Sequence, residues 1–255
     1  MVGMPADSAT GPDGAPGPDW RPVERTRAYE SVIAQVEEQI ASGALKVGDR
    51  LPAEREFAAT LGVSRAAVRE ALRALEAVGV VQTGPGRDAG TVLTSMSSEA
   101  LTRLLRLHIG LANFPMPDVI EARVMLERWS ARLAAQHADD ADRARLTEML
   151  VRMDAPDVAR EEFNDLDTSF HVAIAQAGRN VLVADMTSAI RASMRSPILE
   201  SFYDTPEWAE VQDELRRGHH DVLDAIILGK GTLAADRIEA HIRYAFSALS
   251  WTTRR

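Results

Sequence analysis

Residues 61–72 read LGVSRAAVREAL, and this stretch decides the fold of the N-terminal third of the chain. Gly62 can adopt the left-handed backbone of a tight turn, and Ser64 is a residue type that caps a helix N-terminus. Val68 and Leu72 follow at helical spacing and fall on one apolar face. The stretch therefore predicts a turn followed by a short helix that packs this face inward.

The opposite face of this helix carries Arg65, Arg69 and Arg73, which are spaced four residues apart. A charged stripe of this kind is often no more than a solvated helix face. Here it accompanies a helix, a turn and a second capped helix, which is the arrangement that places a helix in the DNA major groove. Arginine in that position can donate two parallel hydrogen bonds to O6 and N7 of guanine.

The flanking segments predict a winged helix-turn-helix. A first helix is expected over 26–42, and a second begins at Pro52 and ends at Leu61–Gly62. Residues 80–83 and 91–94 are β-prone and flank a glycine-rich turn, so they indicate a two-stranded wing. The segment before the second helix is expected to pair weakly with this wing. The candidate DNA-binding residues are Arg55, Ser64, Arg65, Arg69, Gly86 and Arg87.

Composition limits the other possibilities. The 255 residues are 45% hydrophobic but only 5% aromatic, which favours a helical core. The absence of cysteine excludes disulfides and thiolate metal sites, and no apolar run approaches the roughly 20 residues that span a bilayer. The net charge of −9 does not come from residues 21–95, where acidic and basic residues are equal in number. We expect a cytoplasmic protein without a membrane partner, whose DNA binding depends on a few directed contacts.

The fold class is predicted to be mainly α, with an N-terminal winged helix-turn-helix and a C-terminal antiparallel all-helical bundle. Residues 1–20 are expected to be a disordered tail, 21–95 the DNA-binding domain and 96–255 the helical domain. Trp129, Trp208 and Trp251 are interpreted as packing residues. About seven helices are expected in the bundle, near 97–111, 117–137, 140–153, 157–177, 180–202, 206–228 and 232–250.

Histidines in the helical domain suggest a metal site. Asp167 and His171 are spaced i, i+4, so they share one helix face, and His219 and His241 belong to two later helices. One carboxylate with three imidazoles suits Zn²⁺, and also Ni²⁺, Mn²⁺ or Fe²⁺. On spacing alone, a histidine on a mostly apolar helix is more often an ordinary core or surface residue than a metal ligand. His220 is an alternative to His219.

The N-terminal motifs resemble the winged helix of the GntR family of bacterial transcription regulators. The resemblance covers roughly residues 27–93 and rests on LPAERE at 51–56 and on LGVSRAAVREAL at 61–72. It implies that Arg55, Ser64, Arg65, Arg69 and Gly86 contact DNA. The acid beside Arg87 in the wing departs from a purely basic tip.

Residues 97–250 resemble the all-helical FCD domain of the FadR subfamily, which binds effectors and forms dimers. The resemblance rests on DVIEAR at 118–123, DTSFH at 167–171, AGRN at 177–180 and the histidines that follow. It implies that Asp167, His171, His219 and His241 bind a divalent metal, with Zn²⁺ expected. These residues point away from the acyl-CoA-binding branch, which lacks this metal pattern.

A cavity around such a metal would favour a small carboxylate such as a hydroxy acid, keto acid or sugar acid. Arg123 is the candidate effector-binding residue. Its alternative role is an ion pair with Glu127 at i, i+4, with Glu121 or with an acid on another helix.

These features predict a homodimeric, ligand-responsive transcription regulator, a repressor in the commoner arrangement, that binds a pseudo-palindromic operator in double-stranded DNA. One alternative is a hydrolytic or lyase-type metalloenzyme built on the Asp and three His. It is disfavoured because no general base or nucleophile accompanies the ligands. A third interpretation makes the metal purely structural.

Overall fold

The computed structural model describes residues 26–84, 90–94, 98–111 and 114–251. These residues form two compact units. The N-terminal unit runs to Leu93 but does not include Ala77–Val80. That short segment belongs to the C-terminal unit, together with the residues from Thr94 onward. The predicted tail at 1–20 lies outside the described residues.

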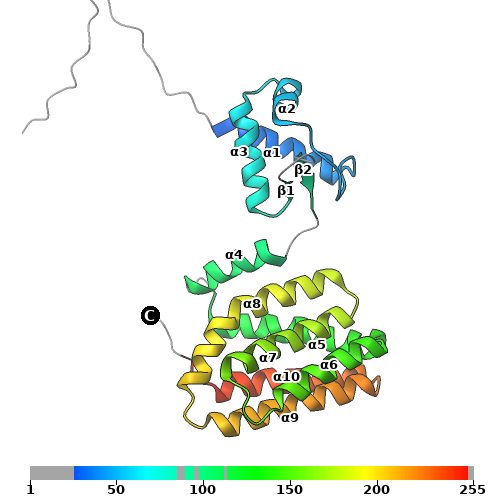
Figure 1. Ribbon diagram of the computed structural model, residues 1–255, viewed down its shortest axis with the longest axis vertical. Helices are drawn as coiled ribbons and strands as arrows, with labels where there is room; N and C mark the ends of the chain where they lie inside the picture. Colours follow the sequence, from blue (N-terminus) through cyan, green and yellow to red (C-terminus); the bar gives the residue numbers. More distant parts are fainter. Residues whose placement is uncertain (1–25, 85–89, 95–97, 112–113, 252–255) are drawn as a thin grey trace, which may run out of the picture. The chain divides into compact units, whose positions relative to one another are not determined.

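The N-terminal unit is a three-helix fold with a β-hairpin (Figure 1). Its strands pair antiparallel, with Val81 opposite Leu93 and Gly84 opposite Gly90. The segment before the second helix joins this hairpin, because Leu51 N–H donates to the Thr91 carbonyl at 2.8 Å. The weak pairing expected there is thus present. The elements are α1 (Thr26–Ala41), α2 (Glu54–Leu61), α3 (Arg65–Ala77), β1 (Val81–Gly84) and β2 (Gly90–Leu93).

The turn between α2 and α3 forms as its sequence predicts. Gly62 closes α2 in the left-handed region, at φ 66°. Ser64 Oγ accepts a hydrogen bond from the backbone N–H of Ala67 at 3.2 Å and so caps α3. The prediction that Pro52 opens α2 is wrong, because α2 begins at Glu54 and Ala53 before it is extended. The buried residues of this unit include Val32, Val36, Phe57, Val68, Leu72 and Leu75.

The C-terminal unit is a bundle of seven helices among its described residues (Figure 1). Helix α7 contacts α5, α6 and α8, and α10 packs between α5 and α9. Two of the seven helices begin at side-chain caps, Asp139 and Asn180, of which Asp139 forms a capping box with Asp142. The helices are α4 (Ser98–Gly110), α5 (Met116–His137), α6 (Asp140–Met153), α7 (Arg160–Ala177), α8 (Val181–Asp204), α9 (Trp208–Ile227) and α10 (Gly231–Ala248). The mainly α fold with a small hairpin is the predicted one.

Helix α8 bends along its length (Figure 1), and Pro197 lies inside it. A proline has no N–H to donate and its ring crowds the preceding turn, so it kinks a helix. Beyond Pro197, Ile198 and Phe202 turn toward the core and become part of a pocket wall. The bend therefore has a direct role in shaping the site.

The tryptophans do not share one environment. Trp208 is buried, whereas Trp129 is 49% exposed, so its interpretation as a packing residue is wrong. Trp251 is half-buried and packs against the core. Within the described ranges, no helix is both long and apolar enough to cross a bilayer.

Candidate functional site

Asp167, His171, His219 and His241 come together inside the C-terminal unit. Helix α7 supplies the first two, α9 the third and α10 the fourth. One potential ligand atom from each residue lies within 4.8 Å of the others, and all four side chains are buried. His220 instead points outward and pairs with Asp154 at 2.8 Å, so His219 is the α9 histidine that faces the cluster.

The carboxylate lies among the imidazoles. Asp167 Oδ1 is 2.9 Å from His219 Nε2 and 3.5 Å from His171 Nε2. The ring of His241 is centred 4.3 Å from that of His219 and 5.3 Å from that of His171. Three rings and one carboxylate from three helices thus converge on one small volume.

Each imidazole of the cluster has one buried nitrogen without a hydrogen-bond partner. These atoms are His171 Nε2, His219 Nδ1 and His241 Nδ1. A buried polar atom left unpaired costs about 1–3 kcal/mol, so three in one cluster call for an explanation. A divalent cation would take the lone pair of His171 Nε2, which faces Asp167, whereas His219 turns Nε2 rather than Nδ1 toward that carboxylate. The donor set therefore fits a Zn²⁺-type ion.

The ionisation of the cluster favours the same occupant. Burial by itself raises the pKa of Asp167, but the charge of Arg191 and the hydrogen bond with His219 hold that pKa well below its usual range. Burial lowers the pKa of His219 despite its contact with Asp167. Burial and the neighbouring imidazoles lower the pKa of His241 further. An ionised Asp167 with uncharged His219 and His241 is the state in which these groups bind metal cations.

A second set of charged residues surrounds the cluster. Glu127 of α5 contacts His171 Nδ1 through Oε2, and its Oε1 accepts a hydrogen bond from Arg123 Nε at 2.9 Å. Arg191 of α8 donates from Nη2 to Asp167 Oδ2. Arg123 therefore forms the i, i+4 pair with Glu127 that was one of its two expected roles, while Glu121 pairs with Arg243. Sequence reasoning missed Arg191, which the sequence does not distinguish from the other charged residues of α8.

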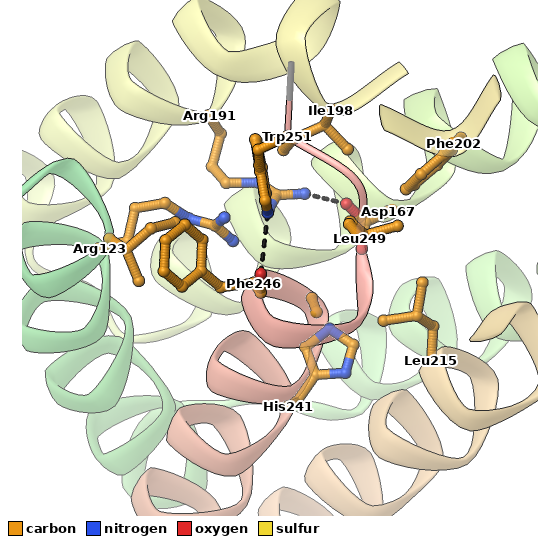
Figure 2. A pocket seen from close by; sticks show the side chains of 12 residues that line it. Arg123, Asp167, Arg191, Ile198, Phe202, Leu215, His241, Phe246, Leu249 and Trp251 are labelled. Carbon is orange, nitrogen blue, oxygen red and sulfur yellow. Dashed lines mark hydrogen bonds and ion pairs between the residues drawn. The ribbon is translucent and has the colours of Figure 1, made fainter. Parts of the chain in front are cut away.

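A small pocket opens beside the cluster. Figure 2 shows Arg123 and Arg191 pointing into it, with Trp251 drawn in front of Arg191 and His241 below. Its volume is about 20 Å³, which is close to the space of one water molecule. The C-terminal end of α10 and the residues after it form one wall, where Trp251 Nε1 donates to the Phe246 carbonyl at 2.8 Å. The full lining is Ile120, Arg123, Asp167, Arg191, Ile198, Phe202, Leu215, His241, Ala245, Phe246, Leu249 and Trp251.

Gly218 shapes the cluster without contributing a side chain. It lies inside α9, next to His219, where glycine is unfavourable. A Cβ added there would lie 2.5 Å from His241 Nδ1, far closer than two such atoms can approach. The imidazole of His241 is thus packed against a bare stretch of helix backbone.

The N-terminal unit presents the predicted arginines to solvent. Arg55, Arg65 and Arg69 are all exposed, and Arg73 continues the same stripe on α3. Arg69 is not free, because its Nε and Nη2 donate to the Glu54 carboxylate of α2, the shortest contact being 2.8 Å. Gly86 and Arg87, the predicted wing residues, lie outside the described residues.

Two family models match this chain. The model described as bacterial regulatory proteins, gntR family, matches residues 28–90, and the FCD domain model matches residues 118–244. The HTH-type transcriptional regulator LutR of Bacillus subtilis (strain 168) is 30% identical over 217 residues, which cover 83% of this chain and 96% of that protein.

Other relatives are similar over most of their length. The Glc operon transcriptional activator of Escherichia coli (strain K12) is 28% identical over 225 residues, which cover 86% of this chain and 88% of that protein. The putative L-lactate dehydrogenase operon regulatory protein of the same strain is 28% identical over 88% of this chain and 86% of its own. A solved structure of Streptococcus agalactiae GntR superimposes with a TM-score of 0.59 at 23% identity, covering 86% of this chain and all of that one. This last likeness supports the fold alone.

Proposed function

From the premise that this chain belongs to the GntR family of transcription regulators and carries an FCD effector-binding domain, we propose that it is a homodimeric repressor released from DNA by a small carboxylate. Two N-terminal units would bind the two halves of a pseudo-palindromic operator, since protein two-fold symmetry is mirrored in such sites. We propose that this regulation takes place in the cytoplasm. The observation that carries the effector part is the buried cluster of one Asp and three His beside a cationic pocket.

Residues 21–95 are assigned to DNA reading and 96–255 to effector binding and dimerisation. Arg65 and Arg69, near the N-terminus of α3, face base edges, Ser64 touches a phosphate and Arg55 lies against the backbone. Gly86 and Arg87 supply the wing contact. Arg69 exchanges its pairing with Glu54 for DNA, and an exposed ion pair of this kind costs little to break.

Asp167, His171, His219 and His241 would hold the cation, most simply Zn²⁺. When bound, it supplies a positive centre with positions open to an oxygen anion. The chain's own residues hold the ligands in place and keep solvent from the cluster, because the surrounding helices bury all four side chains.

Charge balance points to an anionic effector. The buried groups around the cluster include the carboxylates Asp167 and Glu127 and the guanidinium groups Arg123 and Arg191, so their charges cancel. A divalent cation leaves this buried site with a surplus of about +2, which an anion from solution would neutralise. Arg123 remains the proposed effector contact, through the nitrogens that Glu127 does not occupy.

The size and lining of the pocket favour a compact carboxylate. Most of its wall is apolar, with Phe202, Phe246 and Trp251 among the larger side chains. One relative is named for an L-lactate dehydrogenase operon, and lactate is a three-carbon hydroxycarboxylate. We therefore propose a small hydroxy or keto acid ahead of a sugar acid, whose several hydroxyl groups would meet few polar partners here.

The DNA part is tested by footprinting against genomic fragments. A protected inverted repeat is expected, and Arg65→Ala should lose the preference for it. Arg73→Ala is the matched control, because Arg73 lies one turn further from the helix start and should reduce binding to all sequences alike. Equal binding to every fragment by the unaltered protein would refute the proposal.

The effector part is tested by release of the operator from the Zn²⁺-loaded protein. L-lactate is the first probe, and propane-1,2-diol is the matched control because it keeps the carbon skeleton without the carboxylate. Release by the acid alone is expected.

A purely structural metal is the second candidate, and the burial of all four ligand side chains favours it. Asp167→Ala separates the two: a folded variant that binds DNA but ignores carboxylates supports sensing. Loss of folding, with no carboxylate effect in the parent protein, supports a structural ion.

The metalloenzyme alternative is set aside. The chain is a transcription regulator by family, and its named relatives are regulators rather than enzymes.

A further inference from the structure

We propose that Glu127 is a positioning residue that fixes the tautomer of His171, so that Nε2 of this ring presents its lone pair to the Asp/His cluster. The metal-binding consequence of this assignment rests on the proposed function, but the tautomer itself does not. It is a property of the metal-free chain and can be measured there.

The tautomer follows from what each atom can donate. Glu127 is 2% exposed and contacts His171 Nδ1 through Oε2. An ionised carboxylate only accepts hydrogen bonds, so the proton must lie on Nδ1. Arg123 Nε donates to Oε1 of Glu127 at 2.9 Å, and this buried ion pair keeps the carboxylate ionised. In a ring with one proton, on Nδ1, Nε2 then carries the lone pair.

The position of Nε2 agrees with this assignment. It is one of the three buried cluster nitrogens without a hydrogen-bond partner, and it lies 3.5 Å from Asp167 Oδ1. A protonated Nε2 in hydrogen-bonding geometry would approach that oxygen more closely, at about 2.7–2.9 Å. Glu127 thus contacts the ring of His171 at Nδ1, whereas Nε2 has no hydrogen-bond partner.

Arg123 acts through Glu127 in this arrangement. Its Nε occupies Oε1 at 2.9 Å, which leaves only Oε2 for the histidine. Arg191 does the same for Asp167, because it holds Oδ2 while Oδ1 faces His171 and His219. Each buried arginine therefore fixes one oxygen of a carboxylate and directs the other toward the cluster. His241 has no such partner for Nδ1 in the described part of the chain, and Gly218 limits its ring sterically instead.

The first experiment reads the tautomer directly. Long-range ¹H–¹⁵N correlation spectra of the full-length, metal-free protein distinguish Nδ1–H from Nε2–H rings, and a His171→Gln sample identifies the resonance. The Nδ1–H form is expected for His171. An Nε2–H form in the unaltered protein overturns the proposal without any need for a variant.

Glu127→Gln should invert the tautomer. Arg123 will retain the amide oxygen, because Nε can only donate, and the amide NH₂ then faces Nδ1 as a donor. The proton therefore moves to Nε2. Glu121→Gln is the matched control, since Glu121 lies on the same helix but is exposed and pairs with Arg243. An unchanged His171 spectrum in a folded Glu127→Gln protein contradicts the assignment.

The second experiment measures the affinity for Zn²⁺ alone by competition with a chelator. Loss of a residue that orients a metal ligand weakens binding by about 10–100-fold, so this loss is expected for Glu127→Gln and none for Glu121→Gln. Arg123→Gln should add little to Glu127→Gln, because both act through one contact.

The two proposals fail differently. If the unaltered protein ignores Zn²⁺, the metal role is lost while the spectra still decide the tautomer. If Zn²⁺ binds equally well to Glu127→Gln, this inference is lost while the metal role stands.

Discussion

Gly218→Ala offers a sharp test of how the cluster is packed. Alanine in the middle of a helix is normally more favourable than glycine by about 0.5–1 kcal/mol, so the change would usually stabilise the protein. Here the new Cβ lies 2.5 Å from His241 Nδ1, and the ring must retreat by about 1 Å to reach ordinary contact. Overpacking of this kind costs about 1–3 kcal/mol. The net expectation is a loss of about 0–2.5 kcal/mol in the free energy of unfolding.

The sign should reverse when the histidine is removed. In a His241→Ala background the clash is absent and only the helix preference remains, so Gly218→Ala should stabilise by about 0.5–1 kcal/mol. The coupling between the two sites is then about 1–3 kcal/mol, which a double-mutant cycle isolates. Urea unfolding with a chelator present provides the assay. Tryptophan fluorescence is a suitable signal because three of the four tryptophans, Trp129, Trp208 and Trp251, lie in the C-terminal unit.

Equal effects of Gly218→Ala in the two backgrounds would refute this reasoning, whatever their sign. A parallel measurement of Zn²⁺ affinity adds a second criterion. Metal-ligand distances tolerate only about 0.2 Å, so a ring displaced by the new methyl group should bind Zn²⁺ less tightly in the single variant.

Three further predictions concern other parts of the chain. Glu54→Gln should tighten operator binding slightly, because Arg69 no longer has to leave an ion pair to contact DNA; fluorescence anisotropy measures the affinity, and an unchanged affinity argues against an exchangeable pair. The hydrogen bond from the backbone N–H of Asp142 lowers the pKa of Asp139 in the folded protein. The ionised cap therefore stabilises the protein above the unfolded-state pKa of Asp139, and this contribution is lost as the pH falls through the lower folded-state pKa. Asp139→Asn should flatten this part of an acid-unfolding curve. Zn²⁺ at 100 times its dissociation constant should raise the free energy of unfolding by about 2.7 kcal/mol in the unaltered protein but not in Asp167→Asn, and a thermal melt with equal shifts in both would place the ion elsewhere.

The helices could be predicted closely because their signals are local. Helix α6 has the predicted bounds, since Asp139 supplies an N-cap and the helix ends just before Ala155–Pro156. The start of α7 was placed three residues early, because residues 157–159 still belong to the turn that Val158 N–H makes with the Ala155 carbonyl. Pro52 failed for a related reason, because a proline favours a helix start but does not decide which residue begins it.

The cluster could be proposed from sequence because Asp167 and His171 share one helix face and the family resemblance supplied the two distant histidines. Its surroundings could not. Arg191 meets Asp167 across 24 residues and a change of helix, and nothing in a single sequence marks that pair. The same holds for Trp251, which reaches the pocket from beyond the end of α10, and for Gly218, whose purpose depends on a ring 23 positions later.

The narrow pocket has a consequence for sensitivity under the proposed function. Its open space is close to that of one water molecule, so an effector larger than water would bind a wider form of the site. The apparent dissociation constant would then equal the intrinsic one divided by the fraction of molecules in that form. A sensor of this kind would respond only at effector concentrations above the intrinsic dissociation constant. Substitutions that loosen the grip of Trp251 should lower the threshold at which the switch operates.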